Sequence, residues 1–108
     1  MNNYQHDETR ALWNGIAADW DSQVGREGDS NRRLNSDPVL WDLAGPVAGL
    51  DVLDAGCGTG YLSRMLLEKG ATVVGVDFAQ EMIAIARATV PKSTPTTVAP
   101  FSRSMRDR

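Results

Sequence analysis

The sequence predicts an α/β fold built on the start of a doubly wound parallel sheet. Residues 52–55 form a short apolar strand with one charge, as expected for a buried parallel strand. It runs into three glycines at alternate positions, Gly56, Gly58 and Gly60. A helical segment and a second apolar strand follow, and the second strand ends at Asp77. Strand, glycine turn, helix and strand in this order make a nucleotide-binding βαβ unit.

Two helices are predicted before this unit. Residues 1–6 are polar and are expected to fray. From Asp7, a plausible N-cap, apolar residues recur at helical spacing: Leu12, Trp13, Ile16, Ala17 and Trp20. Residues 21–35, rich in Gly, Ser, Asp and Asn, predict a flexible loop. Ser36-Asp37-Pro38 then predicts the start of a short apolar helix that ends at Gly45-Pro46.

Within the βαβ unit each element has its own signal. Leu62, Met65 and Leu66 form an apolar stripe on a helix over residues 61–68, and Lys69-Gly70 ends that helix. The second strand covers residues 72–76. Asp77 lies 17 residues after Gly60, where an acidic residue hydrogen-bonds ribose hydroxyls in nucleotide-binding folds. A right-handed crossover brings the turn and this aspartate to the same sheet edge.

After Asp77 a further helix is predicted over residues 80–89, with Pro91 stopping it. Residues 91–108 contain three prolines, many hydroxyl side chains and four cations without a sustained period. We expect them to form a disordered basic tail, with residues 96–98 as at most a stub of strand.

Composition limits the classes of function. The chain has 108 residues, 42% of them hydrophobic and 23% charged, which is typical of one small globular domain. Neither an apolar run of about 18 residues nor a secretory signal is present, so we expect a cytoplasmic protein without a membrane partner. The net charge of the chain is −3, but residues 1–90 form a more acidic body, with 7 Lys and Arg against 13 Asp and Glu. An acidic body argues against a nucleic-acid partner.

The sequence shows no metal-ligand spacing and no catalytic base. Cys57 is the only cysteine and lies between two glycines. A reactive thiol needs an electropositive surrounding, which the sequence does not display, so Cys57 is interpreted as a small buried side chain. His6 is expected to be an exposed terminal residue.

The stretch from Leu34 to Ala88 resembles the class I S-adenosylmethionine-dependent methyltransferases, which have a Rossmann-like fold. The resemblance rests on Asp54, the G-x-G-x-G turn, Asp77, Phe78 and Met82. It implies S-adenosylmethionine as cofactor and a small-molecule methyl acceptor. In the family, the residues matching Gly56, Cys57, Gly58 and Gly60 pass the methionine portion, and the one matching Asp54 lies near its ammonium. Asp77 would take the ribose hydroxyls, with Phe78 and Met82 flanking the adenine.

Other interpretations stay open at this point. The glycines suit a strand-to-helix turn for backbone reasons alone, Asp54 could cap nearby N–H groups, and Phe78 and Met82 could be ordinary core. A nicotinamide-dependent oxidoreductase shares the βαβ unit and the acidic residue. Its fingerprint places the third small residue where this chain has Tyr61.

The expected organisation therefore has three parts. Residues 1–33 form an amphipathic helix and loop, with a lid over the cofactor as one interpretation. Residues 34–90 form a partial cofactor-binding domain, an incomplete Rossmann-like sheet, and residues 91–108 form the tail. Because later strands carry the catalytic half in the family, we expect a truncated, inactive and weakly folded chain, or a non-enzymatic polypeptide. The acceptor and the oligomeric state are not predicted.

Overall fold

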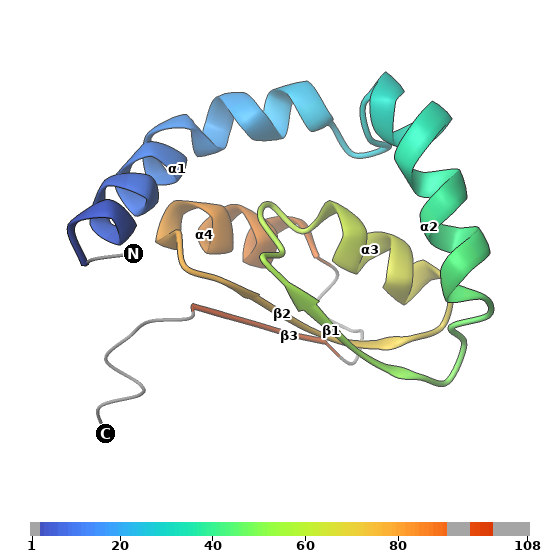
Figure 1. The fold of residues 1–108 in the computed structure, drawn as a ribbon. Helices are drawn as coiled ribbons and strands as arrows, with labels where there is room; N and C mark the ends of the chain where they lie inside the picture. The colour runs from blue at the N-terminus through green and yellow to red at the C-terminus, as the bar shows by residue number, and fades with distance from the viewer. Residues whose placement is uncertain (1–2, 91–95, 101–108) are drawn as a thin grey trace.

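A computed structural model describes residues 3–90 and 96–100 of the chain (Figure 1). It confirms the α/β class. The elements follow the order α1 (Asn3–Val24), η1 (Arg32–Ser36), α2 (Asp37–Ala44), β1 (Asp51–Ala55), α3 (Tyr61–Glu68), β2 (Thr72–Asp77), α4 (Gln80–Thr89) and β3 (Thr96–Pro100).

The three strands form one parallel sheet in the order β1-β2-β3. The strand β3 corrects the prediction of a disordered tail, since residues 96–100 pair with β2 along their length. Val98 explains part of this pairing, because its side chain is 9% exposed and packs in one cluster with Ile83 and Ala86 of α4. Residues 91–95 and 101–108 of the predicted tail lie outside the described residues.

Helices α3 and α4 lie against the same face of the sheet, and α1 lies beyond α4 (Figure 1). On the covered face Val73 is fully buried. Leu53 of β1 pairs with Val74 of β2 and points to the other face, where their exposures are 65% and 42%. Leu53 is exposed because no described element covers that face, as expected for an incomplete sheet, so the predicted buried strand is buried on one face only.

Helix α1 is longer than predicted. It begins at Asn3, so fraying over residues 3–6 and a start at Asp7 are both wrong. Trp13 and Trp20 pack in the cluster around Ala17, as the helical spacing predicted. The other two predicted core positions face outward, since Leu12 is 68% and Ile16 43% exposed.

The predicted loop over residues 21–35 is mostly helical. Only residues 25–29 lack helical structure, and a continuous helix then runs from residue 30 to Ala44. The bounds of α2 match the predicted helix, with Ser36 at the N-cap position and Gly45 after its last residue. The predicted capping role of Ser36 is wrong, because the chain is already helical before it and its side chain makes no capping hydrogen bond. The N–H of Asp37 bonds to the carbonyl of Arg32, which is a π-type bond. This wider turn ends just before Pro38, which has no N–H to donate.

The boundaries of α3 and α4 match the predictions, and Gly70 follows α3 with a φ of 93°. The predicted stripe of α3 needs correction. Leu66 is buried, but Leu62 and Met65 are only half-buried, while Ser63 and Arg64 are buried. The polar burial has a local reason, because Ser63 and Arg64 face partners at the end of β1 and on α4.

Candidate functional site

A cavity of about 660 Å³ opens at the carboxyl ends of β1 and β2. Small-molecule sites commonly measure about 300–1,000 Å³. Residues of the segments 54–62 and 77–82, which we call the floor, line one side, and residues of the segment 13–40, the cover, line the other. The floor contributes Asp54, Ala55, Gly56, Cys57, Gly58, Thr59, Tyr61, Leu62, Asp77, Phe78 and Met82; the cover contributes Trp13, Trp20, Val24, Arg32, Ser36, Asp37 and Leu40.

The glycines of the turn differ in their surroundings. Gly56 and Gly58 line the cavity with φ of 70° and 56°, and a Cβ on either would meet open space. Gly60 does not belong to this lining. A Cβ there would lie 3.2 Å from the Cβ of Ala86 and from Cγ2 of Val90. The structure therefore presents bare backbone to a ligand at Gly56 and Gly58, and it gives Gly60 a packing role against α4.

Asp77 joins the end of β2 to the glycine turn. Its Oδ2 accepts a hydrogen bond from the N–H of Gly58 at 3.0 Å, and its Oδ1 accepts one from Ala79 at 2.8 Å. Each carboxylate oxygen has a further lone pair, so the side chain can still accept hydroxyl donors from the cavity. The spacing predicted from the sequence thus corresponds to a direct contact between the turn and the acidic residue.

Asp54, at the end of β1, is 7% exposed and lines the same cavity. Its Oδ2 accepts a hydrogen bond of 2.7 Å from the hydroxyl of Ser63. Burial raises the pKa of the Asp54 carboxyl, and the charge of Asp77 raises it further, whereas the Ser63 hydroxyl lowers it. The interpretation that Asp54 caps local N–H groups holds in part, since the backbone N–H of Ser63 also lowers the pKa of Asp54, but it misses the side-chain hydroxyl of Ser63.

Cys57 is a buried free cysteine, as interpreted from the sequence. Burial, followed by the charges of Asp54 and Asp77, raises the pKa of its thiol to about 12. The thiol therefore stays protonated at neutral pH and is a poor nucleophile. Its backbone N–H donates to the carbonyl of Val76, which fixes the turn to β2.

The sequence left two interpretations open for Phe78 and Met82, contact with the adenine and ordinary core packing, and the structure is compatible with both. Both line the cavity, and both pack with Trp13 and Trp20 of α1 in one cluster. The two tryptophan rings meet edge to face at 5.6 Å. A flat ligand in the cavity would thus contact aromatic and thioether surface that Phe78 and Met82 share with the two tryptophans.

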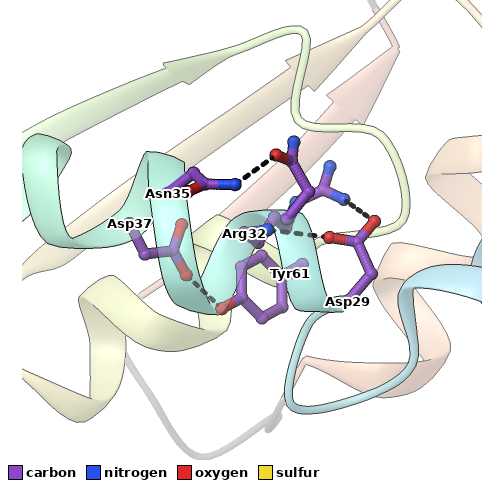
Figure 2. Close-up of polar contacts among 6 residues, drawn as sticks. Asp29, Arg32, Asn35, Asp37 and Tyr61 are labelled. Carbon is purple, nitrogen blue, oxygen red and sulfur yellow. Dashed lines mark hydrogen bonds and ion pairs between the residues drawn. The ribbon is translucent and has the colours of Figure 1, made fainter.

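Two polar contacts connect the cover to the floor, and the sequence predicted neither. Asn14 Oδ1 accepts a hydrogen bond from the N–H of Glu81 at 3.0 Å, which caps the first turn of α4. Near the other end of the cover, the hydroxyl of Tyr61 donates to Asp37 (Figure 2). Asparagine opposite a helix start is a recognisable signal only after the two helices are placed together.

Arg32 completes the contact at Tyr61. Its guanidinium lies 5.6 Å from the ring centroid of Trp20 and 5.4 Å from that of Tyr61. It also pairs with Asp29 at 3.3 Å, as Figure 2 shows beside the Tyr61 ring. Burial and the neighbouring Asp37 raise the pKa of Tyr61 to about 12, so its hydroxyl remains a donor. One cation thus links the end of α1, the helix of η1 and the start of α3.

Arg64 is a second structural residue that the sequence did not indicate. It is 9% exposed, and its Nη1 donates to the carbonyl of Thr59 at 3.0 Å and to the hydroxyl of Thr89 at 2.8 Å. These bonds hold the glycine turn against α4. Within the described residues, no group of three or more His, Cys, Asp or Glu side chains is arranged to hold a metal ion.

The cavity residues fit S-adenosylmethionine. Asp54 provides a buried carboxyl group that suits an ammonium, and Asp77 has lone pairs that suit hydroxyls. Gly56 and Gly58 leave open space beside the backbone, and Phe78 provides an aromatic surface.

None of the helices in residues 3–90 has the length and apolarity needed to cross a membrane.

Sequence comparison gives the same assignment. Residues 52–107 match the model of a family described as methyltransferase domain. The chain is 43% identical over 72 residues to the O-antigen chain terminator bifunctional methyltransferase/kinase WbdD of Escherichia coli. The aligned region covers 65% of this chain and 10% of that protein. It is 36% identical over 90 residues to a ubiquinone biosynthesis O-methyltransferase of Pseudomonas paraeruginosa, covering 81% of this chain and 37% of that protein. The chain thus spans well under half the length of these curated relatives.

Solved structures are similar as well. An S-adenosylmethionine-dependent methyltransferase from Mesorhizobium loti matches with a TM-score of 0.60 and 33% identity, over 72% of this chain and 33% of that one. Magnesium protoporphyrin IX methyltransferase from Synechocystis, solved with bound SAH, matches with a TM-score of 0.68 and 26% sequence identity. The match covers 90% of this chain and 51% of that one. These findings do not favour the nicotinamide alternative. The chain therefore belongs to the methyltransferase domain family, within the class I S-adenosylmethionine-dependent group.

Proposed function

We propose that this chain binds S-adenosylmethionine between the floor and the cover, with Asp54, Gly56, Cys57, Gly58, Gly60, Asp77, Phe78 and Met82 forming the cofactor site. The observation that carries the proposal is the placement of two carboxylates, Asp54 and Asp77, on either side of a bare glycine turn in one cavity. When bound, the cofactor supplies a methyl group on a sulfonium for in-line transfer.

Each proposed role has a physical reason. Asp54 compensates the ammonium of the methionine portion, because a buried carboxylate is stabilised by an adjacent cation. Asp77 accepts the ribose hydroxyls while it holds the N–H of Gly58 and Ala79. Phe78 and Met82 flank the adenine. Gly60 acts indirectly, by letting α3 start close to Ala86 of α4 and to Val90, which follows that helix.

The cover is proposed to act as a lid. Its support is that Trp13, Trp20 and Asp37 line the cavity from the side opposite the turn. The acceptor is proposed to be a small molecule, which the names of the ubiquinone biosynthesis and magnesium protoporphyrin IX relatives support. The protein residues would contribute mainly by aligning the acceptor with the methyl group.

We expect no turnover from residues 1–108 alone. The support is that Leu53 and Val74 leave one sheet face exposed within the described part of the chain, so the sheet lacks cover there. The same exposure predicts binding of an apolar dye and a shallow unfolding transition. A sharp transition, or methyl transfer to any acceptor, would contradict this expectation.

The cofactor assignment is tested by calorimetric titration of the chain with S-adenosylhomocysteine and, separately, with NAD. Saturable binding of the first and much weaker binding of the second is expected. Equal or tighter binding of NAD would overturn the assignment.

A further inference from the structure

Ser63 is a fully buried hydroxyl residue in the first turn of α3, and the roles proposed above do not use it. Its hydroxyl donates to Asp54 across the turn, at 2.7 Å. Hydrogen bonds to a carboxylate are short and stronger than those between neutral groups. The bond therefore fixes both the rotamer of Asp54 and the side of the carboxylate that remains open to the cavity.

The surroundings of Asp54 make this bond important. The carboxyl is buried and also faces the carboxylate of Asp77 at the end of β2, and both effects favour its protonated form. From the turn, the Cys57 thiol contributes no charge at neutral pH. From the cover, Arg32 and Asp37 line the same cavity with opposite charges. Ser63 of α3 thus favours the charged form of Asp54 through both its hydroxyl and its backbone N–H, and only the hydroxyl depends on the side chain.

We propose that Ser63 is a positioning residue for the cofactor, whose hydroxyl keeps Asp54 oriented and ionised for the ammonium of the methionine portion. This inference rests on the proposed function. Without the hydroxyl, Asp54 takes up a proton at a higher pH, because the remaining effects of burial and of Asp77 are then less opposed. A protonated Asp54 no longer compensates an ammonium, and the affinity for the cofactor falls.

The packing around Ser63 allows a clean test. A Cβ placed on Gly75 would lie 3.3 Å from the Ser63 Oγ, so β2 passes close to this side chain. Ser63→Ala removes the hydroxyl oxygen and adds no heavy atom. It therefore creates no steric clash with β2, α3 or the turn. It deletes the hydroxyl and leaves the carboxylate of Asp54 in place.

The experiment measures the dissociation constant of S-adenosylhomocysteine by calorimetry between about pH 4 and pH 8. Four proteins are compared: the parent chain, Ser63→Ala, Asp54→Asn and the double variant. In Ser63→Ala the loss of affinity on the acid side should begin at a higher pH, by about one unit, which corresponds to a tenfold weaker binding there. In the Asp54→Asn background, Ser63→Ala should leave the pH profile unchanged. Superimposable profiles of the parent chain and Ser63→Ala would overturn the proposal.

Thr72→Val is the control. It removes a hydroxyl at the exposed start of β2, the strand end away from the cavity. It should leave the pH profile of binding where it is in the parent chain. A second readout needs no ligand: the carboxyl carbon of Asp54, followed by NMR, should titrate at a higher pH in Ser63→Ala. An unchanged titration overturns the proposal, whereas a shifted titration without any cofactor binding overturns the proposed function alone.

Discussion

The floor and the cover differ in how far apart along the chain their contacts lie. The contacts that hold the floor are close in sequence, with Gly58 and Asp77 separated by 19 residues and Asp54 and its α3 partner Ser63 by 9. The contacts that attach the cover span longer distances, 24 residues for Tyr61 and Asp37 and 67 for Asn14 and Glu81. The floor is therefore specified within one βαβ unit, whereas the cover depends on tertiary packing.

The two sides also differ in what their residues do. The floor holds backbone and carboxylates in place through the rigid ends of two strands. The cover contributes aromatic and apolar surface and is attached by few polar contacts, with residues 25–29 as a non-helical link. We infer that changes in the floor affect recognition most, and that changes in the cover affect how firmly the cavity is closed.

The largest effect is expected at Asp77. In Asp77→Ala the affinity for S-adenosylhomocysteine should fall by about 1.5–3 kcal/mol, the range for hydrogen bonds to a charged group. Stability should fall too, because Gly58 and Ala79 lose their acceptor. Asp77→Asn should recover part of the affinity. The control is Asp42→Ala, which removes an exposed carboxylate on α2. If calorimetry finds the same affinity for Asp77→Ala and for this control, the ribose role of Asp77 is refuted.

A second effect separates packing from recognition within the turn. Gly60→Ala should destabilise the fold by about 1–3 kcal/mol, because the added methyl group meets Ala86 and Val90 in a well-packed region. Gly58→Ala places its methyl group in open space beside the cavity. Thermal unfolding should therefore show the larger loss for Gly60→Ala. Ligand titration at low temperature should show the larger loss for Gly58→Ala, and the reverse pattern would contradict these assignments.

A smaller effect is expected at the contact between cover and floor. Tyr61→Phe keeps the ring against Arg32 and removes the hydroxyl that donates to Asp37. We expect a loss of about 1 kcal/mol in stability and faster release of S-adenosylhomocysteine in stopped-flow experiments. Asp37→Asn should have a similar effect. If the two changes act through one bond, the double variant should resemble either single one; additive effects would show that the bond does not close the cavity.

The sequence predicted the floor well because each element there has a local signal. Three glycines end the first strand, an apolar segment ends at Asp77, and Lys69-Gly70 marks the end of α3. It predicted neither Ser63 nor Arg64 as buried polar residues, since their partners become visible only when the strand end and α4 face α3.

The cover was predicted poorly for the opposite reason. Gly, Ser and Asn in residues 21–35 indicate a loop by local preference, yet tertiary contacts of Arg32 with Trp20 and Tyr61 accompany a helix there. Ser36 before Pro38 resembles a helix start, but the π-helical turn continues the helix through it. The strand β3 was predicted only as a stub at residues 96–98, because Thr96, Thr97 and Pro100 carry little apolar pattern, and pairing with β2 places it in the sheet.

The most direct test of a cofactor held between floor and cover is an NMR titration of the ¹⁵N-labelled chain with S-adenosylhomocysteine. The account predicts saturable shifts of the backbone amides of Gly56, Gly58 and Phe78 from the floor. The indole N–H signals of Trp13 and Trp20 from the cover should shift with the same dissociation constant, while that of Trp41, outside the cavity lining, should not. Shifts confined to Trp41 and its neighbours, or no shift at the glycine turn at saturation, would contradict the account.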